Sequence, residues 1–520
     1  MAAIIEPDKK WKKLQNGSDI RGVALDLDPS EPVNLTPAEA FVITRAFTVW
    51  LTKHGYEGRS GLRISVGTDS RLSGPALKAA ALDAIASAGH TPVDCGIAST
   101  PAMFMSCIFE QTRCDGAIMI TASHLPANRN GLKFFTKDGG LEKKDITEIL
   151  ITANGDGPSL HSDSLHAATE VIHLDLIDIY SGDLVDKIRR GADSPNDHMR
   201  PLAGLKIIVD AGNGAGGFFA EKVLKPLGAD TSGSQFLDPD GTFPNHMPNP
   251  ENKEAMASVC KAVLDSGADF GIIFDTDVDR AGAVDKFGRE VNRNRIIALM
   301  SAIVLEEHPG STVVTDSITS AELKEFIETV LGGRHHRFKR GYKNVINESI
   351  RLNSIGEESH LAIETSGHGA LKENYFMDDG AYLIAKILIK IAKLKTEGKT
   401  IDSLIKSLSE PLEAMEFRFS IRQDDFRAYG ETVLSDLSKY ALLQKGWTVA
   451  KDNFEGIRVS LDNLRGNGWF LLRMSLHDPI MPLNIESNDA GGIRKIAESL
   501  LGFLNTYADL DISSMKDHVW

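Results

Sequence analysis

Residues 115–135 read DGAIMITASHLPANRNGLKFF, and the expected fold follows from this stretch. The apolar run Ala117–Ile120 is too short for a helix and is bounded by glycine and polar residues, as expected for a buried strand. The run ends at Thr121–His124, and Pro126 follows, which cannot continue a β-ladder. A serine hydroxyl and an imidazole are thus predicted in a loop at the carboxyl end of a strand, where open α/β sheets bind ligands. An ordinary turn is the alternative for a Ser-His pair taken alone.

Helical and strand patterns alternate on both sides of this stretch. The predicted helices cover 35–54, 75–88 and 145–154, and the predicted strands cover 62–66 and 91–97. This alternation is typical of an α/β domain with a largely parallel sheet. Residues 155–166 have the composition of a polar connection, and Arg21 is expected in a turn formed by Gly17–Gly22.

A similar sequence pattern of apolar runs and polar loops occurs three times along the chain. A glycine and a β-branched run appear as GLRISV at 61–66, GLKIIV at 204–209 and GSTVVT at 310–315. Further on in each segment, a second apolar run ends in a polar loop: AIMITASH at 117–124, GIIFDTDVDR at 271–280 and LAIETSGHG at 361–369. We therefore predict three related α/β units, each contributing one loop.

The last part of the chain has a different pattern. Strands are predicted at 416–421, 456–460 and 469–474, and an amphipathic helix at 490–508, which is the order of an α+β domain. The predicted architecture is therefore three related α/β mixed-sheet domains, at 1–172, 173–288 and 289–409, and a C-terminal α+β domain at 410–520.

Bulk composition restricts the classes of partner. The chain has 520 residues and a net charge of −15, which disfavours nucleic acid and anionic membranes as partners. No apolar run reaches the ~18 residues of a membrane span. The N-terminal stretch lacks a secretory apolar region and is too acidic for a typical transit peptide. None of the four cysteines forms a Cys-x-x-Cys pair, so a reducing, cytoplasmic location is expected.

The second loop contains the strongest candidate metal site. Asp275, Asp277 and Asp279 alternate directly after the apolar run Gly271–Phe274. If the backbone turns, these carboxylates converge, and hard oxygen ligands at this density suit Mg²⁺. An acidic, solvated turn is the alternative. An EF-hand is disfavoured because the sixth position of the loop is Arg280, where that motif requires glycine.

Two further loops offer groups that bind sugars and phosphate. Glu364, Ser366 and His368 supply an acceptor, a hydroxyl and an imidazole between glycines, although a glycine-rich turn is the simpler interpretation. Arg473 and Ser475 leave a predicted strand and can bind phosphate, but a surface ion pair between this arginine and Asp478 is equally consistent.

Together these parts favour phosphoryl transfer on a polyol phosphate. A loop hydroxyl, a Mg²⁺ site, hydroxyl-binding groups and a phosphate anchor are the components that this reaction needs. No Gly-x-x-x-x-Gly-Lys-Ser/Thr loop occurs, so ATP is not supported as the phosphoryl donor.

The Thr-Ala-Ser-His-x-Pro and Asp-x-Asp-x-Asp-Arg loops, in this order, resemble those of the α-D-phosphohexomutases, the superfamily of phosphoglucomutase and phosphomannomutase. The resemblance extends from about residue 17 to residue 505. It implies a reversible isomerase that moves a phosphoryl group between C1 and C6 of a glucose or mannose phosphate. It also implies four domains around a central cleft, Mg²⁺ as cofactor, glucose 1,6-bisphosphate as activator, and a monomer or homodimer that binds a small phosphosugar.

The resemblance also implies roles for individual residues. Ser123 would be the phosphoserine and, with Asp275, Asp277 and Asp279, a ligand of Mg²⁺. The other catalytic candidates are His124, Lys133, Arg280 and His368. The candidate substrate-binding residues are Arg21, Glu364, Ser366, Arg473, Ser475 and His477.

The sequence departs from the family pattern most clearly in the phosphate loop. Leu476, His477 and Asp478 replace Gly-Thr-Glu, and Pro482 replaces a second arginine, so the grip on phosphate is expected to differ, with His477 as a substitute donor. Three alternatives follow: a phosphoglucosamine mutase, a catalytically weak phosphosugar-binding paralogue, or a metal-dependent phosphatase with an aspartyl nucleophile. The phosphatase leaves Ser123 and Glu364 without a role.

Overall fold

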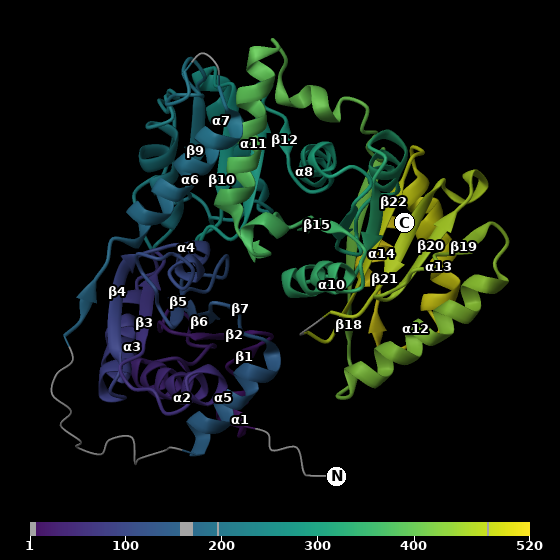
Figure 1. The fold of residues 1–520 in the computed structure, drawn as a ribbon. Helices are drawn as coiled ribbons and strands as arrows, with labels where there is room; N and C mark the ends of the chain where they lie inside the picture. The colour runs from purple at the N-terminus through teal and green to yellow at the C-terminus, as the bar shows by residue number, and fades with distance from the viewer. Residues whose placement is uncertain (1–6, 156–169, 195–196, 476–477, 520) are drawn as a thin grey trace. The chain divides into compact units, whose positions relative to one another are not determined.

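The computed structural model describes residues 7–155, 170–194, 197–475 and 478–519 (Figure 1). The chain divides into two compact units. The first comprises residues 1–292 and 366–403, and the second comprises residues 293–365 and 404–520. The predicted polar connection lies, from residue 156 onward, outside the described residues.

The first unit contains an eight-stranded mixed sheet. Its order is β1-β2-β6-β5-β3-β4-β8, with β7 beside β6. The strands are β1 Gln15–Asn16, β2 Asp19–Val23, β3 Arg63–Thr68, β4 Thr91–Ile97, β5 Gly116–Ile120, β6 Arg129–Thr136, β7 Gly139–Gly140 and β8 Ile172–His173. Strands β8, β4, β3 and β5 run parallel, whereas β6, β2 and β1 pair antiparallel. The expectation of a largely parallel sheet is thus wrong for one half, because β6 returns from the serine loop directly beside β5.

Helices cover this sheet, and their starts follow local sequence rules. The helices are α1 Lys9–Lys12, α2 Pro37–Gly55, α3 Gly74–Ser87, α4 Thr100–Met105, α5 Lys143–Gly155 and α6 Leu176–Ala192. Helix α2 begins at a proline, and the side chain of Thr36 forms a capping box with Glu39. It packs against α3 and α5, and Phe47 and Phe134 meet in the core between helix and sheet. The three helices predicted in this region are confirmed.

The prediction for Arg21 is wrong in one respect. This residue lies inside strand β2, which pairs with β6, and not in a turn. The ladder places Arg21 opposite Gly131, so tertiary pairing overrides the turn-forming composition around it. By contrast, the predicted strand before the serine loop is confirmed, and all five residues of β5 are buried.

A second sheet in the first unit has the order β12-β11-β10-β9. Its elements are β9 Ile207–Asp210, α7 Lys253–Ser266, β10 Phe270–Phe274, β11 Ala281–Asp285 and β12 Glu290–Val291, with short helices at Ala215–Gly217 and Phe219–Leu224. The hairpin β16 Gly369–Leu371 and β17 Met377–Asp378, the short helix Lys372–Asn374 and helix α11 Gly380–Thr396 complete the unit. Helix α11 packs against α6, and a Cβ on Gly191 would lie 2.5 Å from Ile389.

The second unit contains a parallel trio of strands and an antiparallel sheet. The order of the trio is β14-β13-β15. Its strands and the neighbouring helices are, in chain order, α8 Asn294–Glu307, β13 Thr312–Thr315, α9 Ala321–Glu325, a π-helical turn Phe326–Val330, β14 Arg334–Arg337, α10 Tyr342–Ser354 and β15 Ser359–Ile363. The antiparallel sheet, β19-β20-β21-β22-β18-β23, and its helices are β18 Glu413–Ile421, α12 Phe426–Leu443, β19 Trp447–Val449, β20 Ile457–Leu461, β21 Gly468–Leu472, β22 Ile480–Ser487, α13 Gly492–Leu504, β23 Leu510–Asp511 and α14 Ser513–Val519. Two further 3-10 helices are Ile401–Ile405 and Asn463–Arg465.

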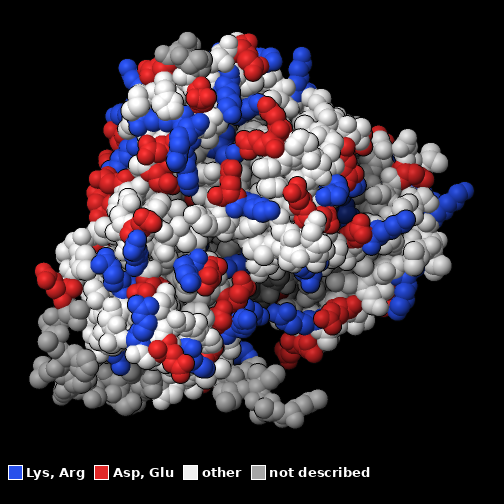
Figure 2. Space-filling view, in the orientation of Figure 1, with Lys and Arg blue, Asp and Glu red and all other residues white. Residues whose placement is uncertain are grey.

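The last domain is an α+β domain, as predicted, but it contains more helices and strands than the sequence pattern indicated. Helix α12 follows β18 directly, whereas only a final helix was expected, and that helix, α13, is shorter than the predicted span 490–508. On the face drawn in Figure 2, basic and acidic side chains are interspersed. Among the described residues, no helix combines the length and apolarity that a membrane crossing requires.

Gly131 tests the close packing of β2 against β6. A Cβ at this position would lie 2.1 Å from the carbonyl oxygen of Ile20, so Gly131→Ala forces the strands apart. We expect it to destabilise the first unit by about 2 kcal/mol or more, measured by urea unfolding. Gly55→Ala, where the space around the Cβ position is open, is the control and should change stability by less than about 1 kcal/mol. Equal unfolding midpoints for the two variants would contradict this packing.

Candidate active site

Ser123 lies in the loop that joins β5 to β6, within the first unit. Its side chain is buried, and its backbone has a φ of 50°, in the left-handed region that residues other than glycine seldom adopt. The backbone N–H of Ser123 donates to the hydroxyl of Thr121 over 2.8 Å. Strained backbone of this kind costs on the order of 1–3 kcal/mol and persists only where surrounding contacts hold it.

The hydroxyl of Ser123 points toward the second polar loop. Ser123 Oγ donates to Asp275 Oδ2 over 2.9 Å and lies 3.3 Å from His124 Nδ1. The guanidinium of Arg280 donates to the same hydroxyl over 3.5 Å. The structure thus brings together the serine loop and the aspartate loop, which are separated by about 150 residues in the sequence.

The aspartate loop joins β10 to the antiparallel strand β11 and turns sharply. Val278, at its centre, also has a positive φ, of 67°. One carboxylate oxygen from each of Asp275, Asp277 and Asp279 lies within 4.8 Å of the other two, and all three residues are buried. Burial raises the pKa of Asp275 well above its ordinary value, and the neighbouring carboxylates raise it further. The convergence expected from the alternating carboxylates is present.

Two basic side chains balance part of this charge. Lys133, on β6, places Nζ 3.2 Å from Asp277 Oδ2 and also donates to Asp279. Burial opposes the charge on Lys133, but these carboxylates raise its pKa well above its ordinary value. Arg280 Nε lies 3.1 Å from Asp275 Oδ2. Lys133 and Arg280 therefore bring two positive charges to the three carboxylates.

The cluster fits a divalent cation. Asp277 Oδ1 and Asp279 Oδ1 are buried and have no hydrogen-bond partner among the described residues. Carboxylate oxygens without partners in an apolar interior are costly, and a hard cation satisfies both their charge and their lone pairs. A set of three carboxylates beside a hydroxyl leaves room in the coordination shell for a phosphate oxygen.

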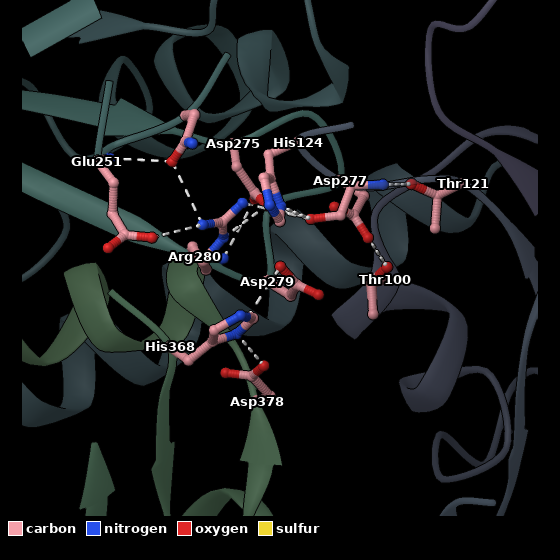
Figure 3. A network of polar contacts seen from close by, with 12 residues as sticks. Thr100, Thr121, His124, Glu251, Asp275, Asp277, Asp279, Arg280, His368 and Asp378 are labelled. Carbon is pink, nitrogen blue, oxygen red and sulfur yellow. Dashed lines mark hydrogen bonds and ion pairs between the residues drawn. The ribbon is translucent and has the colours of Figure 1, made fainter. Parts of the chain in front are cut away.

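Several residues that support this cluster were missed from the sequence. Thr100, at the start of α4, donates its hydroxyl to Asp277 Oδ2 and its backbone N–H to Asp277 O. Asn249 and Glu251 contact the guanidinium of Arg280 over 3.3 Å and 3.6 Å (Figure 3). No signal in the sequence identified them, because each acts through a partner that only the folding of the chain brings close.

His368 lies on the other side of Asp279. Its Nδ1 is hydrogen bonded to Asp378 and lies 4.0 Å from Asp279 Oδ1. Burial opposes the charge on this imidazole, but the two carboxylates raise its pKa to about 9. His368 is therefore protonated at neutral pH and suited to donate a proton. Ser366 Oγ, two residues earlier, is buried without a hydrogen-bond partner among the described residues.

The remaining candidates of the first unit also lie near Ser123. The ring of His124 is exposed, and the positive charge of Arg280 is the principal cause that lowers its pKa. Its imidazole is therefore uncharged at neutral pH. Arg21 donates to the carbonyl of Thr121 over 2.5 Å and pairs with Asp19 over 2.8 Å, so its guanidinium lies at the start of the serine loop.

In the second unit, Glu364 directly follows β15 and accepts from the backbone N–H of Gly341 over 2.6 Å. Arg473 follows β21, is buried, and lies 3.9 Å from Glu455. Its Nε has no hydrogen-bond partner in the described part of the chain, and burial lowers its pKa. Ser475 pairs through its backbone with Ile480. The predicted donor His477 lies outside the described residues.

Glu455 was not anticipated from the sequence. Its carboxylate accepts from Ser317 Oγ over 2.5 Å and from the backbone N–H of Arg340 over 3.1 Å. It therefore links the antiparallel sheet to the parallel trio of strands and supplies a weak counter-ion for Arg473. An arginine held this loosely is available to an incoming anion.

Comparison with known proteins gives the family. Models of phosphoglucomutase/phosphomannomutase α/β/α domains I, II and III match residues 12–155, 184–288 and 292–412. The chain is 30% identical to the phosphoglucomutase/phosphomannomutase of Thermococcus kodakarensis over 492 residues, which covers 94% of this chain and 97% of that protein. It is 29% identical over 485 residues to the phosphoglucomutase of Neisseria gonorrhoeae, covering 92% and 94% of the two chains.

A solved structure agrees with these sequence relatives. The crystal structure of a phosphoglucomutase/phosphomannomutase family protein from Burkholderia thailandensis superposes with a TM-score of 0.75 at 26% identity, covering 95% of this chain and 98% of that chain. These likenesses extend over both polar loops, the acidic cluster and the C-terminal domain. The chain belongs to the phosphoglucomutase/phosphomannomutase family of isomerases.

Proposed function

We propose that this protein moves a phosphoryl group reversibly between C1 and C6 of a glucose or mannose phosphate through a phosphoserine at Ser123. The observation that carries the proposal is the hydrogen bond of 2.9 Å from the Ser123 hydroxyl to Asp275 of the buried acidic cluster. A hydroxyl at this position can exchange a phosphoryl group next to a bound metal ion. The retained cluster also disfavours a catalytically weak paralogue.

The reaction consists of two successive phosphoryl transfers. In the first, the bond between phosphorus and Ser123 Oγ breaks, and the phosphoryl group passes to the free hydroxyl of the hexose phosphate. The proton of that hydroxyl goes to a base, and Ser123 Oγ takes up a proton as it leaves. In the second, the Ser123 hydroxyl gives up its proton and takes the phosphoryl group from the other end of the hexose 1,6-bisphosphate. The sugar oxygen that leaves takes up a proton from a protonated group. We assign the acid and base roles to His368, whose raised pKa suits the acid role. In the same proposal, His124 and Lys133 assist proton transfer and charge balance.

Mg²⁺ is the proposed cofactor. Asp275, Asp277, Asp279 and a phosphoryl oxygen on Ser123 would hold the ion, which supplies positive charge to the oxygens of the transferring group. Arg280 contacts the Ser123 hydroxyl and adds a second fixed cation. Glucose 1,6-bisphosphate is the proposed activator, because it can place the first phosphoryl group on the serine.

Substrate binding is assigned by chemistry. Glu364 and Ser366 would accept and donate hydrogen bonds to sugar hydroxyls, and Arg21, Arg473 and Ser475 would bind phosphate. The domain limits near residues 172, 288 and 409 and the state of monomer or homodimer are part of the same proposal. The four cysteine thiols, all in the described part of the chain, form no disulfide, which supports a reducing location such as the cytoplasm.

The serine and substrate assignments are tested together. We expect the wild-type protein, with Mg²⁺ and catalytic glucose 1,6-bisphosphate, to convert glucose 1-phosphate or mannose 1-phosphate faster than glucosamine 1-phosphate. Ser123→Ala should lower kcat by on the order of 10⁴-fold or more and abolish phosphorylation detected by intact mass. Ser181→Ala, which removes another buried hydroxyl, is the control and should keep wild-type turnover. Wild-type turnover in Ser123→Ala would refute the phosphoserine.

Asp277→Asn tests the metal site directly. The amide keeps the hydrogen bond from Thr100 but removes one negative charge, so we expect divalent cation affinity to fall by about tenfold or more. The measurement is Mn²⁺ binding by electron paramagnetic resonance, followed by competition with Mg²⁺. Asp265→Asn removes an exposed charge in the same domain and should leave binding unchanged. Identical binding by both variants would remove Asp277 from the site.

Arg473→Gln tests whether the C-terminal domain binds the phosphate group of the substrate through this arginine. Charge-assisted hydrogen bonds contribute about 1.5–3 kcal/mol, so we expect KM for the hexose phosphate to rise by about 10- to 100-fold. Arg418→Gln, at an exposed position on β18, is the matched control for loss of an arginine. If KM is the same in both variants, another group binds this phosphate.

A further inference from the structure

One buried arginine near the serine loop has no role in the proposed chemistry. Arg71 follows β3 in the sequence Gly67–Arg71 and is 1% exposed, which makes it one of the largest fully buried side chains of the protein. It does not contact Asp275, Asp277 or Asp279. Its guanidinium is directed instead at main-chain carbonyl groups of the serine loop.

The contacts of Arg71 converge on one short segment. Nη1 donates to the carbonyl oxygens of Pro126 and Arg129 over 2.7 Å and 3.0 Å. Nη2 donates to the carbonyl oxygens of Ser123 and Leu125. One guanidinium thus binds four carbonyl groups within seven residues, a geometry that its planar fork allows and a lysine ammonium does not.

A second set of hydrogen bonds links Arg71 to the backbone of Ser123 through Asp69 and Thr121. The backbone N–H of Arg71 donates to Asp69 Oδ1 over 2.9 Å, and its Nε lies 3.3 Å from Asp69 Oδ2. Thr121 donates its hydroxyl to Asp69 Oδ2 over 2.7 Å and accepts the backbone N–H of Ser123. The carbonyl group of Ser123 is therefore bound by Arg71 directly, and its N–H is bound by Thr121, which Asp69 holds in turn.

Residues of the second α/β domain cover these hydrogen bonds and exclude water from them. The aromatic ring of Phe243 lies over the guanidinium, with its centroid 5.4 Å from the central carbon. A Cβ on Gly241 would lie 2.5 Å from the carbonyl oxygen of Ser70. Exclusion of water strengthens the hydrogen bonds beneath this cover and raises the cost of losing any one of them.

From these contacts we infer that Arg71 is a positioning residue for Ser123. It holds the left-handed backbone that directs the hydroxyl at Asp275, and it acts through four carbonyl groups without touching the substrate. This inference rests on the proposed role of Ser123 as the phosphoryl carrier. A misplacement of about 1 Å at a reacting atom can cost about 100-fold in rate, so the contribution falls on kcat and not on binding.

The test compares Arg71→Lys and Arg71→Ala with Arg129→Ala. Arg129 belongs to the same segment, but its side chain turns outward to Glu31, so its removal controls for loss of an arginine there. We expect Arg71→Lys to lower kcat by about 100-fold with KM within about threefold of wild type, and Arg129→Ala to retain kcat. Millimolar guanidinium should restore at least part of the kcat lost in Arg71→Ala, whereas sodium at equal ionic strength should not.

Hydrogen exchange separates this inference from the proposed function. Faster exchange of the segment 121–130 in Arg71→Lys, compared with wild type, would show loss of loop order whether or not the protein turns over a sugar phosphate. An inactive wild type would refute the proposed function alone. An active wild type with unchanged kcat in Arg71→Lys, or with a proportional rise in KM only, would overturn the positioning role. If Arg71→Ala fails to fold, Arg71→Lys decides the question.

Discussion

Three carboxylates buried beside one hydroxyl are stable only if positive charge lies among them, and the first unit is arranged to supply it. Asp275, Asp277 and Asp279 come from one hairpin, Lys133 comes from the strand that leaves the serine loop, and Arg280 ends the acidic loop itself. Because Asp277 Oδ1 and Asp279 Oδ1 are buried without a hydrogen-bond partner among the described residues, the cluster favours a bound cation. A bound cation would relieve the repulsion among these buried carboxylates, and this gain in free energy would contribute to metal affinity.

The two loops meet because both belong to the same type of connection. In each domain of the first unit, a buried parallel strand turns directly into an antiparallel neighbour: β5 into β6, and β10 into β11. Polar residues that follow such strands emerge at one edge of the sheet, where no side chain of the core competes for them. Left-handed backbone at Ser123 and Val278 makes both turns sharp enough to direct their side chains inward.

The sequence was sufficient to identify residues whose chemistry and local pattern agree. Ser123 and the three aspartates follow apolar runs, so their location could be predicted, and the chemistry proposed for them stays a prediction. Thr100, Glu251 and Glu455 could not, because each is an ordinary residue whose partner is distant in the chain and is selected only by packing. Arg71 is an intermediate case: it follows a predicted strand, but nothing in its neighbours indicates four main-chain carbonyls as partners. Helix α12 was not predicted: only Gly430, Val433, Leu437 and Ala441 of its residues are buried, so its apolar stripe is narrow.

The division of the chain has a consequence for biosynthesis. The first unit is discontinuous, and helix α11, with 13 buried residues, belongs to it although 73 residues of the second unit precede the segment 366–403. The ribosome must therefore add about 110 residues after position 292 before this unit can complete its core, which takes roughly 5 to 20 s at typical rates of synthesis. During this interval the surface of α6 that later contacts α11 remains uncovered. Nascent chains of this architecture would thus depend on chaperones more than chains whose domains are continuous. A truncation before α11, which begins at Gly380, would expose the same surface permanently.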